Sequence, residues 1–575
     1  MRNAELAHTF ERIADLIEIT GGDPFRVNSY RRAARTIGDL TEDIAAVAAR
    51  GKLTELPGIG KSTAERIGQF LETGTIDILV ELEAKLPKGL PDLLGIPGMG
   101  PKKVAAVHRE LKVGGLDDLK RVIESGTLEK LAGFGPTSVR KIAEGIAFLE
   151  TSGGRTPLGI VTPVANAIVD GLARTSGVKR VVIAGSLRRG VETIGDVDIL
   201  CEAADGRKVI DAFVHGTGVK RVLASGDTKG SVTVELYDRR ELQIDLRVVA
   251  AESFGAALQY FTGSKEHNVR LREIAVRKKW RLNEYGLFAG EKRLAGATEE
   301  EIYARLGLPC FPPELREDRG EFDDPDCVAD LVAAEDIRGD LHMHTTASDG
   351  TATIEEMALA AKALGYEYLA ICDHSRSSTI ADGMSIERME RHIQDIGEAN
   401  RKVEGITILA GCEVDIRSGG ELDYPDEILR ECDLVVASIH SGMQGGRTSP
   451  TRRTLAAMEN PYVTIIGHLT GRLIQQRPPM ELDVAAIVKA AAQTGTALEV
   501  NASWQRLDLK DAHVRQAVEA GAMLAISTDA HSPDGLTEMP YGVTTARRGR
   551  APKGSVLNTR TLSNLRKWIA KKRGR

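Results

Sequence analysis

The most restrictive feature of the sequence is a series of short apolar segments after residue 334, each of which ends at a polar side chain. Helix-like stretches such as "TIEEMALAAKALG" and "DVAAIVKAAAQTG" lie between several of them. Alternation of strands and helices at this spacing predicts parallel strands in a barrel. Seven candidate strands end near His342, His374, Glu413, His440, His468, Asn501 and Asp529. Barrels of this kind carry their chemistry at the C-terminal ends of the strands, where these side chains are expected.

Nine residues at these strand ends, or one turn beyond them, are the expected metal ligands. They are His342, His344, Asp349, His374, Glu413, His440, His468, Asp529 and His531. Metal sites use about three or four protein ligands per ion, so this set can hold two or three ions if a carboxylate such as Glu413 bridges. A lone histidine at a strand end is usually structural, but half of the 12 histidines of the chain recur here, which favours a metal cluster.

Other side chains near these strand ends are expected to have structural roles. Cys372 and Cys412 should point to the opposite faces of their strands and pack as small apolar groups. The remaining histidines are expected to be surface or structural residues, namely His8, His108, His215, His267, His392 and His513.

Residues 1–150 show helical periodicity and no convincing strand, so this part is expected to be all helical. One pattern occurs in it three times, as "LPGIGKSTAERI", "IPGMGPKKVAAV" and "LAGFGPTSVRKI". Two glycines permit a tight turn and leave the first N–H groups of the next helix free to face a phosphate. Three copies favour binding of the DNA backbone over simple hairpins with a shared turn. The residues expected at DNA are Gly58, Gly60, Lys61, Gly98, Gly100, Lys102, Gly133 and Gly135.

A second cluster of carboxylates is expected in a β-rich region that begins near residue 151. Asp196 and Asp198 lie two residues apart on a predicted strand, so both side chains share one face. Asp245 lies among apolar residues in "LQIDLRVV", where a charge needs a cationic or metal partner. The D-x-D spacing alone would indicate no more than a solvated strand end, but three carboxylates together favour a site for divalent metal.

The residues just before this cluster suit a polyphosphate. Gly185 and Ser186 close a predicted strand, and Arg188 and Arg189 follow them. They supply a tight turn, backbone N–H groups, a hydroxyl and two guanidinium groups. Together with the carboxylates, this arrangement describes phosphoryl or nucleotidyl transfer.

Composition limits the classes of protein that this chain can represent. A length of 575 residues predicts about three to five domains. Six scattered cysteines without a C-x-x-C pair, no run of about 18 apolar residues and no cleavable leader predict a cytoplasmic protein. The net charge of -6 does not itself indicate a nucleic-acid binder, but acidic metal sites can mask basic grooves in this total.

The motifs of the first 315 residues resemble those of the family X DNA polymerases. Gly185-Ser186 followed by Asp196-Val197-Asp198 is similar to the nucleotidyltransferase signature, and "YFTGS" (260–264), "LNEYGLF" and "NSYRRAARTI" are similar to other blocks of that family. The H-x-H pair, the "DH" after the second strand and the final D-x-H resemble the PHP (polymerase and histidinol phosphatase) family over residues 334 to about 570. The two together resemble bacterial family X polymerases that carry a C-terminal PHP domain.

The resemblance implies roles for individual residues of the polymerase part. Asp196 and Asp198 would bind both catalytic metals, Mg²⁺ or Mn²⁺, and Asp245 the one that activates the primer 3′-hydroxyl. The triphosphate would be held by Arg155, Gly185, Ser186, Arg189 and Gly195. Tyr260 would crowd the sugar 2′ position, and Asn268 and Arg272 would face the nascent pair and template, although a generic basic helix explains the last two nearly as well.

One position departs from the family pattern. Members with 5′-deoxyribose-phosphate lyase activity form a Schiff base with a lysine in the second helix of the first hairpin motif, and here that position is Arg66. A guanidinium stays protonated and is a poor amine nucleophile. Weak or absent lyase activity is therefore expected.

The resemblance predicts a multidomain fold: an all-α helix-hairpin-helix part, an α/β nucleotidyltransferase palm like that of polymerase β, and a distorted (β/α)7 PHP barrel. The expected boundaries are 1–80 and 81–150 for two helical DNA-binding parts, 151–250 for the palm, 251–315 for a nucleotide-selecting subdomain, 316–333 for a linker and 334–575 for the PHP domain.

The expected function is template-directed gap filling in DNA repair, with a metal-dependent 3′–5′ exonuclease, 3′-end-processing or abasic-site endonuclease activity in the barrel, served by Zn²⁺ or Mn²⁺. The expected partners are gapped or primed double-stranded DNA and dNTPs, with no membrane, and a monomer is expected. Two alternatives are open: a DNA-tethered PHP nuclease with little polymerase activity, and a PHP domain that acts as a small-molecule phosphatase.

Overall fold

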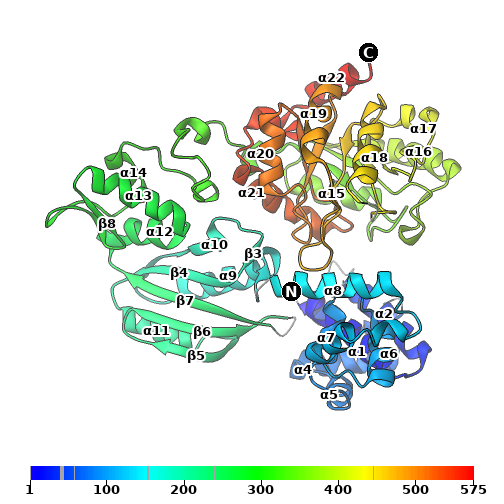
Figure 1. The fold of residues 1–575 in the computed structure, drawn as a ribbon, viewed down its shortest axis with the longest axis horizontal. Helices are drawn as coiled ribbons and strands as arrows, with labels where there is room; N and C mark the ends of the chain where they lie inside the picture. Colours follow the sequence, from blue (N-terminus) through cyan, green and yellow to red (C-terminus); the bar gives the residue numbers. More distant parts are fainter. Residues whose placement is uncertain are drawn as a thin grey trace. The chain divides into compact units, whose positions relative to one another are not determined.

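The computed structural model describes residues 2–38, 44–56, 58–96, 98–151, 154–237, 240–443 and 446–574. Pro57 and Pro97 of the first two glycine motifs lie outside these ranges. The chain divides into two compact units, one formed by residues 1–154 with 475–478 and the other by residues 155–474 with 479–575 (Figure 1). No helix among the described residues is long and apolar enough to cross a membrane.

The N-terminal unit is helical throughout its described residues, as predicted. Its α-helices are α1 (Arg2–Ile19), α2 (Pro24–Gly38), α3 (Ile44–Ala49), α4 (Lys61–Thr73), α5 (Asp77–Ala84), α6 (Pro101–Leu111), α7 (Leu116–Glu124) and α8 (Pro136–Thr151). Short 3-10 turns separate some of them, at Leu53–Glu55, Pro91–Gly95 and Leu128–Lys130. One continuous cluster of buried apolar side chains runs from Leu6 in α1 to Ile146 in α8. These helices therefore share a single core.

A five-stranded mixed sheet follows, in the order β2-β4-β7-β6-β5. Its elements, with a small β1–β3 pair beside it, are β1 (Thr156–Pro157), α9 (Leu158–Ala173), β2 (Val178–Ile183), α10 (Gly185–Arg188), β3 (Thr193–Ile194), β4 (Asp196–Ala203), α11 (Gly206–Val214), β5 (Val219–Ser225), β6 (Lys229–Glu235) and β7 (Glu241–Val249). Val197 and Ile199 of β4 and Ile244 of β7 pack in one core cluster with α9 and α11. Because side chains alternate along a strand, the intervening residues of β4 and β7 face the other side of the sheet.

A smaller subdomain follows the sheet along the chain. It contains α12 (Phe254–Thr262), α13 (Lys265–Arg277), β8 (Arg281–Asn283), β9 (Gly286–Ala289), β10 (Lys292–Ala295) and α14 (Glu299–Leu306). The segment expected to be a linker, residues 316–333, makes specific contacts. Arg316 is buried and donates to the carbonyl of Phe311, and Arg319 Nη1 lies 2.9 Å from Asp511 Oδ2.

The last part of the chain is a seven-stranded parallel sheet whose spatial order follows the sequence, from β11 to β17. Its strands are β11 (Gly339–Met343), β12 (Tyr368–Ile371), β13 (Thr407–Asp415), β14 (Leu434–Ser438), β15 (Ile465–Ile466), β16 (Ala497–Asn501) and β17 (Leu524–Ser527). Hydrogen bonds from His344 N to Ala530 O and from Asp529 N to His342 O join the two ends of the sheet. The sheet is thus nearly closed, which confirms the predicted seven-stranded barrel.

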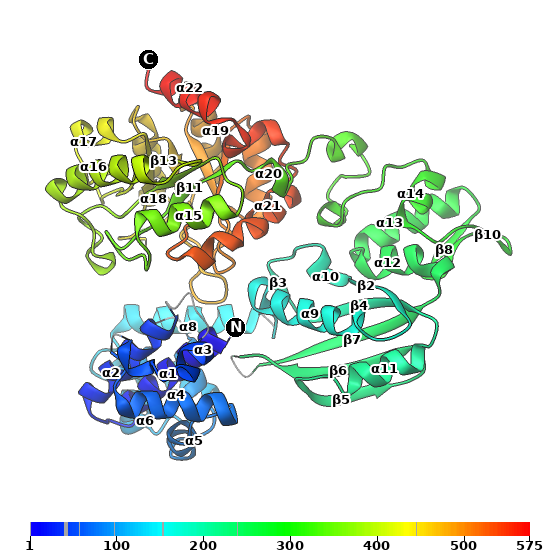
Figure 2. The ribbon, with the colours of Figure 1, turned by 180° about the vertical axis from the view of Figure 1, so that it is seen from behind.

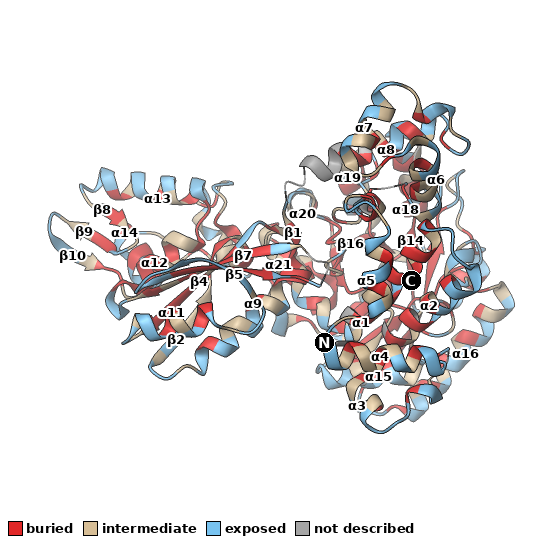
Figure 3. Ribbon diagram, turned by 90° about the horizontal axis from the view of Figure 1, so that it is seen from below, coloured by how far each residue is buried: buried red, intermediate tan, exposed pale blue. Residues whose placement is uncertain are grey.

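Helices surround these strands (Figures 1 and 2). They are α15 (Ile354–Ala363), α16 (Ile386–Lys402), α17 (Asp426–Glu431), α18 (Thr448–Glu459), α19 (Val484–Thr494), α20 (Asp511–Glu519), α21 (Met539–Arg548) and α22 (Leu562–Lys572). The barrel strands are buried along almost their whole length, which Figure 3 shows for β14 and β16. One core cluster takes side chains from every barrel strand and from Leu565 and Ile569 of α22, so α22 closes the barrel interior.

The two cysteines near the strand ends differ in where they pack. Cys412 lies in the large cluster that includes residues of the surrounding helices, as expected for a side chain on the outer face of its strand. Cys372 instead lies in the interior cluster, where its thiol donates to the carbonyl of Leu341. The expectation of an opposite face was wrong for Cys372 because it continues the alternation of β12: Tyr368, Ala370 and Cys372 all pack in the interior cluster, whereas Leu369 and Ile371 pack in another one. Both remain buried. Burial raises the pKa of the Cys372 thiol, and the contact with Cys432, together with burial, raises the pKa of the Cys412 thiol.

Two candidate metal centres

The first centre lies on the side of the five-stranded sheet opposite α9 and α11. Asp198 of β4 and Asp245 of β7 are register partners in adjacent parallel strands, and Asp196 lies two residues before Asp198 on the same face. Asp196 is exposed, and the other two carboxylates are partly buried. Burial, reinforced by the charges of Asp196 and Asp245, raises the pKa of Asp198 to about 6. Three carboxylates that repel one another at an accessible strand face fit one or two divalent cations.

The turn at Gly185, where α10 begins, lies very close to Asp198 of this centre. Gly185 has a φ of +66°, and a Cβ atom there would lie 2.8 Å from Asp198 Oδ2. Only glycine combines that backbone conformation with so close an approach to the carboxylate. The first residues of α10 therefore lie directly beside the three aspartates, with Ser186 partly exposed.

Four of the expected nucleotide-binding residues line one cavity of about 490 Å³: Arg189, Tyr260, Asn268 and Arg272. Lys265 and Glu317 line it as well. The Asn268 amide donates to the carbonyl of Tyr260 at 2.7 Å and accepts from Gln259 Nε2 at 2.6 Å, so internal contacts fix its orientation. Three cationic side chains, against the acids Glu266 and Glu317, give the lining a net positive charge, which suits an anion.

Two other predicted phosphate-binding residues lie on the β3 side of the site. Arg155 donates from Nε to Thr193 Oγ1 at 3.0 Å, and its Nη1 would lie 3.3 Å from a Cβ atom at Gly195. Arg188, expected beside Arg189 at a polyphosphate, is instead held by Glu299 in a bidentate pair at 3.0 and 2.7 Å. It thus joins α10 to α14 instead of facing the cavity, because a bidentate carboxylate uses the fork of the guanidinium.

The second centre lies at the C-terminal ends of the barrel strands, where all nine predicted ligands come together. Glu413 is central and fully buried. Its Oε1 lies 2.9 Å from His468 Nε2 and 3.3 Å from His440 Nε2. Its Oε2 lies 2.8 Å from His374 Nδ1 and 3.6 Å from His342 Nε2. The two oxygens of one carboxylate thus face different histidines, as in a bridging ligand.

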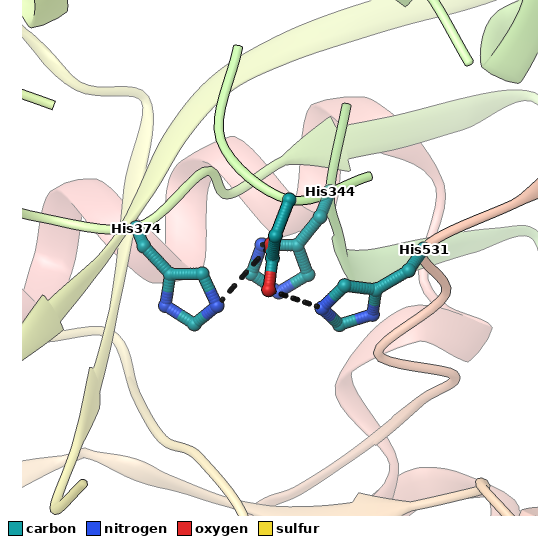
Figure 4. Close-up of side chains that lie close together, drawn as sticks. His344, His374 and His531 are labelled. Atoms are coloured by element: carbon teal, nitrogen blue, oxygen red, sulfur yellow. Dashed lines mark ion pairs between the residues drawn. The ribbon is translucent and has the colours of Figure 1, made fainter. Parts of the chain in front are cut away.

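The other two acids complete the cluster. Asp529 Oδ1 lies 3.1 Å from His344 Nε2, and Asp349 lies 3.6 Å from His374 Nε2 and 3.4 Å from His531 Nε2. The rings of His344, His374 and His531 converge on one point (Figure 4). Three groups of three or four potential ligands arise, and His344 and His374 each belong to two of them. This sharing fits a cluster of metals instead of a single ion.

Several potential ligand atoms of this cluster have no hydrogen-bond partner. Both carboxylate oxygens of Glu413 and both ring nitrogens of His468 are buried and have no hydrogen-bond partner. Such orphaned atoms are rare in folded proteins, and a metal ion satisfies them. Burial, with the neighbouring rings of His531 and His374, lowers the pKa of His344 to about 4, which keeps that imidazole in the neutral form that binds metal.

Backbone conformation also marks this centre. His468 has a φ of 22° and Asp529 a φ of 56°, values that residues other than glycine rarely adopt. Strain of this kind gathers at functional sites, where the surroundings must impose it.

A second layer of polar residues orients the ligands, and the sequence analysis did not identify it. His342 Nδ1 lies 2.7 Å from Glu499 Oε1, which leaves Nε2 to face the cluster. Asp415 holds His440 Nδ1 in the same way. Asn501, expected near a strand end, donates to Asp529 Oδ2 at 3.1 Å. Arg506 Nε lies 3.5 Å from the same oxygen.

Two histidines left aside in the sequence analysis are buried structural residues. His392 Nε2 lies 2.9 Å from Asp373, the residue before His374. His267 lies between Glu321 and the Tyr303 hydroxyl, each at 2.8 Å, inside the subdomain after the sheet.

The three glycine motifs of the N-terminal unit share one backbone geometry. The first glycine of each has a positive φ, of 78°, 87° and 88° at Gly58, Gly98 and Gly133. The second glycine precedes a helix, and no side chain caps the starts of α4 and α6 at Gly60 and Gly100. The first N–H groups of α4 are thus available to an anion, whereas α6 begins with Pro101, which has no N–H, and offers that of Lys102. Exposed Lys61 and Lys102 lie at these helix starts.

Comparisons with known proteins agree with this architecture. Residues 1–76 match the helix-hairpin-helix domain, residues 90–147 the SAM-like helix-hairpin-helix tandem, residues 257–317 the DNA polymerase beta thumb, and residues 340–503 the PHP domain. A Bacillus subtilis protein, DNA polymerase/3′-5′ exonuclease PolX, is 38% identical over 571 residues, which cover 99% of each chain.

Other relatives match the barrel part alone. A probable phosphatase of Caldanaerobacter subterraneus is 28% identical over 250 residues, 41% of this chain and 92% of that protein. A probable phosphatase of Shewanella sediminis is 29% identical over 229 residues, 38% of this chain and 88% of that protein.

The fold and its two centres define a family X type polymerase region joined to a PHP barrel. The chain belongs to the bacterial PolX family, since the match to the B. subtilis member extends over nearly the whole length of both proteins.

Proposed function

We propose that this chain fills short gaps in DNA as a family X polymerase and removes nucleotides from 3′ ends with its PHP barrel. The observation that carries the polymerase half is the register of Asp198 with Asp245, with Asp196 on the same open face of the sheet. The observation that supports the nuclease half is the convergence of nine ligands around the unpartnered carboxylate of Glu413.

In the polymerase site the three aspartates would hold Mg²⁺ or Mn²⁺, which supplies activation of the primer 3′-hydroxyl and stabilises charge on the α-phosphate. The residues of the chain position the nucleotide. Ser186 and the turn at Gly185 lie beside Asp198, so the polyphosphate would lie along α10. Arg155 on one side and Arg189 on the other would neutralise its charge, and the backbone of Gly195 would lie beside Arg155. Tyr260 would lie against the sugar, and Asn268 and Arg272 toward the base pair.

In the barrel the nine ligands would hold a cluster of Zn²⁺ or Mn²⁺, which supplies a hydroxide nucleophile at neutral pH and binds the phosphoryl oxygens. The two carboxylate oxygens of Glu413 lie 2.8 to 3.6 Å from ring nitrogens of four of the histidines, and Glu499 fixes the ring of His342. The substrate would be the phosphodiester at a DNA 3′ end, with 3′-end processing and abasic sites as further substrates of the same chemistry.

The glycine motifs would hold DNA for both sites. Backbone N–H groups at α4 and α6 bind phosphates without reading sequence, which suits an enzyme that must act at any gap. The partners would be gapped or primed duplex DNA and dNTPs, met in the cytoplasm by a monomer. The division of labour follows the expected boundaries: DNA binding in 1–80 and 81–150, transfer in 151–250, nucleotide selection in 251–315 and hydrolysis in 334–575, with 316–333 between the last two.

One assay tests both halves. Labelled one-nucleotide-gapped DNA is incubated with Mn²⁺, with and without dNTPs, and the product lengths are measured. Extension that requires dNTPs, with shortening in their absence, supports the proposal. A protein that only shortens DNA would be the tethered nuclease, and one that cleaves p-nitrophenyl phosphate or pyrophosphate but leaves DNA intact would be the small-molecule phosphatase.

We further propose that the chain has little 5′-deoxyribose-phosphate lyase activity. Arg66 Nη1 donates to the carbonyl of Ser62 at 3.0 Å, and the guanidinium lies over the ring of Tyr30. Both contacts suit a permanent cation and neither activates a nucleophile.

A further inference from the structure

Glu317 lies against Arg189, one of the three cationic residues that line the cavity described above. Arg189 Nε donates to Glu317 Oε1 at 3.1 Å. Arg189 Nη1 donates to the carbonyls of Thr262 at 2.7 Å and Gly263 at 3.2 Å. The Arg189 and Glu317 side chains are only 15% and 16% exposed. Arg189 is therefore already occupied by a carboxylate that belongs to the chain itself.

Glu317 has a second cationic partner from the barrel. Arg548, at the end of α21, lies with Nη1 at 3.0 Å from the same Glu317 Oε1, and it donates to the backbone carbonyl of Arg189 at 2.8 Å. Its Nη2 lies 3.0 Å from Asp511. One carboxylate oxygen thus accepts from two guanidinium groups, of which only Arg189 faces the cavity.

The charges of the cavity indicate what could replace Glu317. Arg189, Lys265 and Arg272 face it, against the acids Glu266 and Glu317. A guanidinium binds a carboxylate and a phosphate through the same charged hydrogen bonds. A polyphosphate that enters the cavity therefore competes with Glu317 for Arg189.

We propose that Glu317 is a built-in competitor for the phosphates of the incoming nucleotide, holding Arg189 in the nucleotide-free enzyme and releasing it when a triphosphate binds. The exchange leaves neither side chain without an oppositely charged partner, because Arg548 still pairs with Glu317 after Arg189 has moved to the phosphate. The inference rests on the proposed function, since it assumes that the cavity takes a nucleotide. It adds Glu317, in the segment that follows the small subdomain, as a residue that sets the affinity for the nucleotide.

The test compares two isosteric variants of the same segment. Glu317→Gln keeps the shape and removes the competing charge. Glu314→Gln is the matched control, because Glu314 pairs with Arg547 at 2.8 Å and does not line the cavity. The Kd of a non-hydrolysable α,β-imido dNTP is measured on the full chain bound to gapped DNA with Mg²⁺. We expect Glu317→Gln to tighten binding about fivefold, which corresponds to about 1 kcal/mol, and Glu314→Gln to leave it unchanged.

A second probe shows whether phosphate contacts carry the gain. Inorganic tripolyphosphate, as a competitive inhibitor of extension, should gain about the same factor in Glu317→Gln as the dNTP analogue does. An unchanged or weaker Kd in Glu317→Gln, at an unfolding temperature equal to that of the wild type, overturns the inference, as does an equal gain in Glu314→Gln. Failure of the proposed function looks different, since the wild type would then neither bind the analogue nor extend a primer.

Discussion

Asp198 and Asp245 stand opposite each other on adjacent parallel strands, in the same register position of β4 and β7. Burial, reinforced by the charges of Asp196 and of the neighbouring Asp245, raises the pKa of Asp198 to about 6 from an ordinary value of 3.8. The ionised form is therefore disfavoured in the folded, metal-free protein. This destabilising effect is absent below the ordinary pKa and is complete above the raised one.

The raised pKa predicts a pH dependence for metal binding at the palm. Metal must displace the proton from Asp198 below pH of about 6, so Mn²⁺ affinity should fall about tenfold for each pH unit below that value and level off above it. Primer extension at subsaturating Mn²⁺, followed from about pH 5 to 8, measures this. A rate of primer extension that changes equally steeply with pH above and below about pH 6 would contradict this prediction.

Glu499 provides a prediction for the barrel. Its Oε1 lies 2.7 Å from His342 Nδ1, and both side chains are fully buried. Glu499→Gln should weaken metal binding by about 10-fold to 100-fold, because the carboxylate fixes the orientation and basicity of the imidazole. Metal content after dialysis against a chelator series is the measurement, with the exposed Glu519→Gln on α20 as the control. Equal metal retention in both variants would show that Glu499 does not position His342.

The salt dependence of DNA binding should report how many phosphates the lysines of the glycine motifs contact. Lys61→Ala and Lys102→Ala should each weaken binding of gapped DNA about threefold and reduce the slope of log K against log salt by about one, if each lysine contacts one phosphate. Fluorescence anisotropy at four salt concentrations gives both quantities. Lys567→Ala on α22 serves as a comparison, since that exposed lysine lies outside the motifs. An equal effect of all three substitutions would indicate non-specific charge instead.

The lyase prediction is best tested as a gain of activity. Wild-type protein should give little borohydride-trapped product on an incised abasic site, because Arg66 cannot form a Schiff base. Arg66→Lys places an amine at that position and should raise trapping. Efficient trapping by the wild type, lost on substitution of a nearby lysine such as Lys61, would prove the expectation wrong.

The sequence predicted residues whose positions follow from local periodicity. Asp196 and Asp198 could be placed on one face because side chains alternate along a strand, and the barrel ligands because each follows its own strand. The all-helical N-terminal part and the seven parallel strands could be predicted for the same reason, since each element carries its own pattern.

Pairs that depend on tertiary structure could not be predicted in this way. Glu499 is 157 residues from His342, and Glu299 is 111 residues from Arg188. Nothing near Arg188 indicates that its guanidinium is held by α14 while Arg189 next to it lines the cavity. Asp415, which holds His440, could have been identified from the local sequence, because it lies two residues after Glu413 on the same face of β13.

The central claim, two independent active sites in one chain, is tested most directly by reciprocal inactivation. Wild type, Asp198→Ala and His344→Ala are compared on the same labelled one-nucleotide-gapped DNA with Mn²⁺, with dNTPs for extension and without them for 3′ degradation. We predict that Asp198→Ala lowers extension by at least about a hundredfold and spares degradation, and that His344→Ala does the reverse. Extension that survives Asp198→Ala, or degradation that survives His344→Ala, would contradict the assignment of that site.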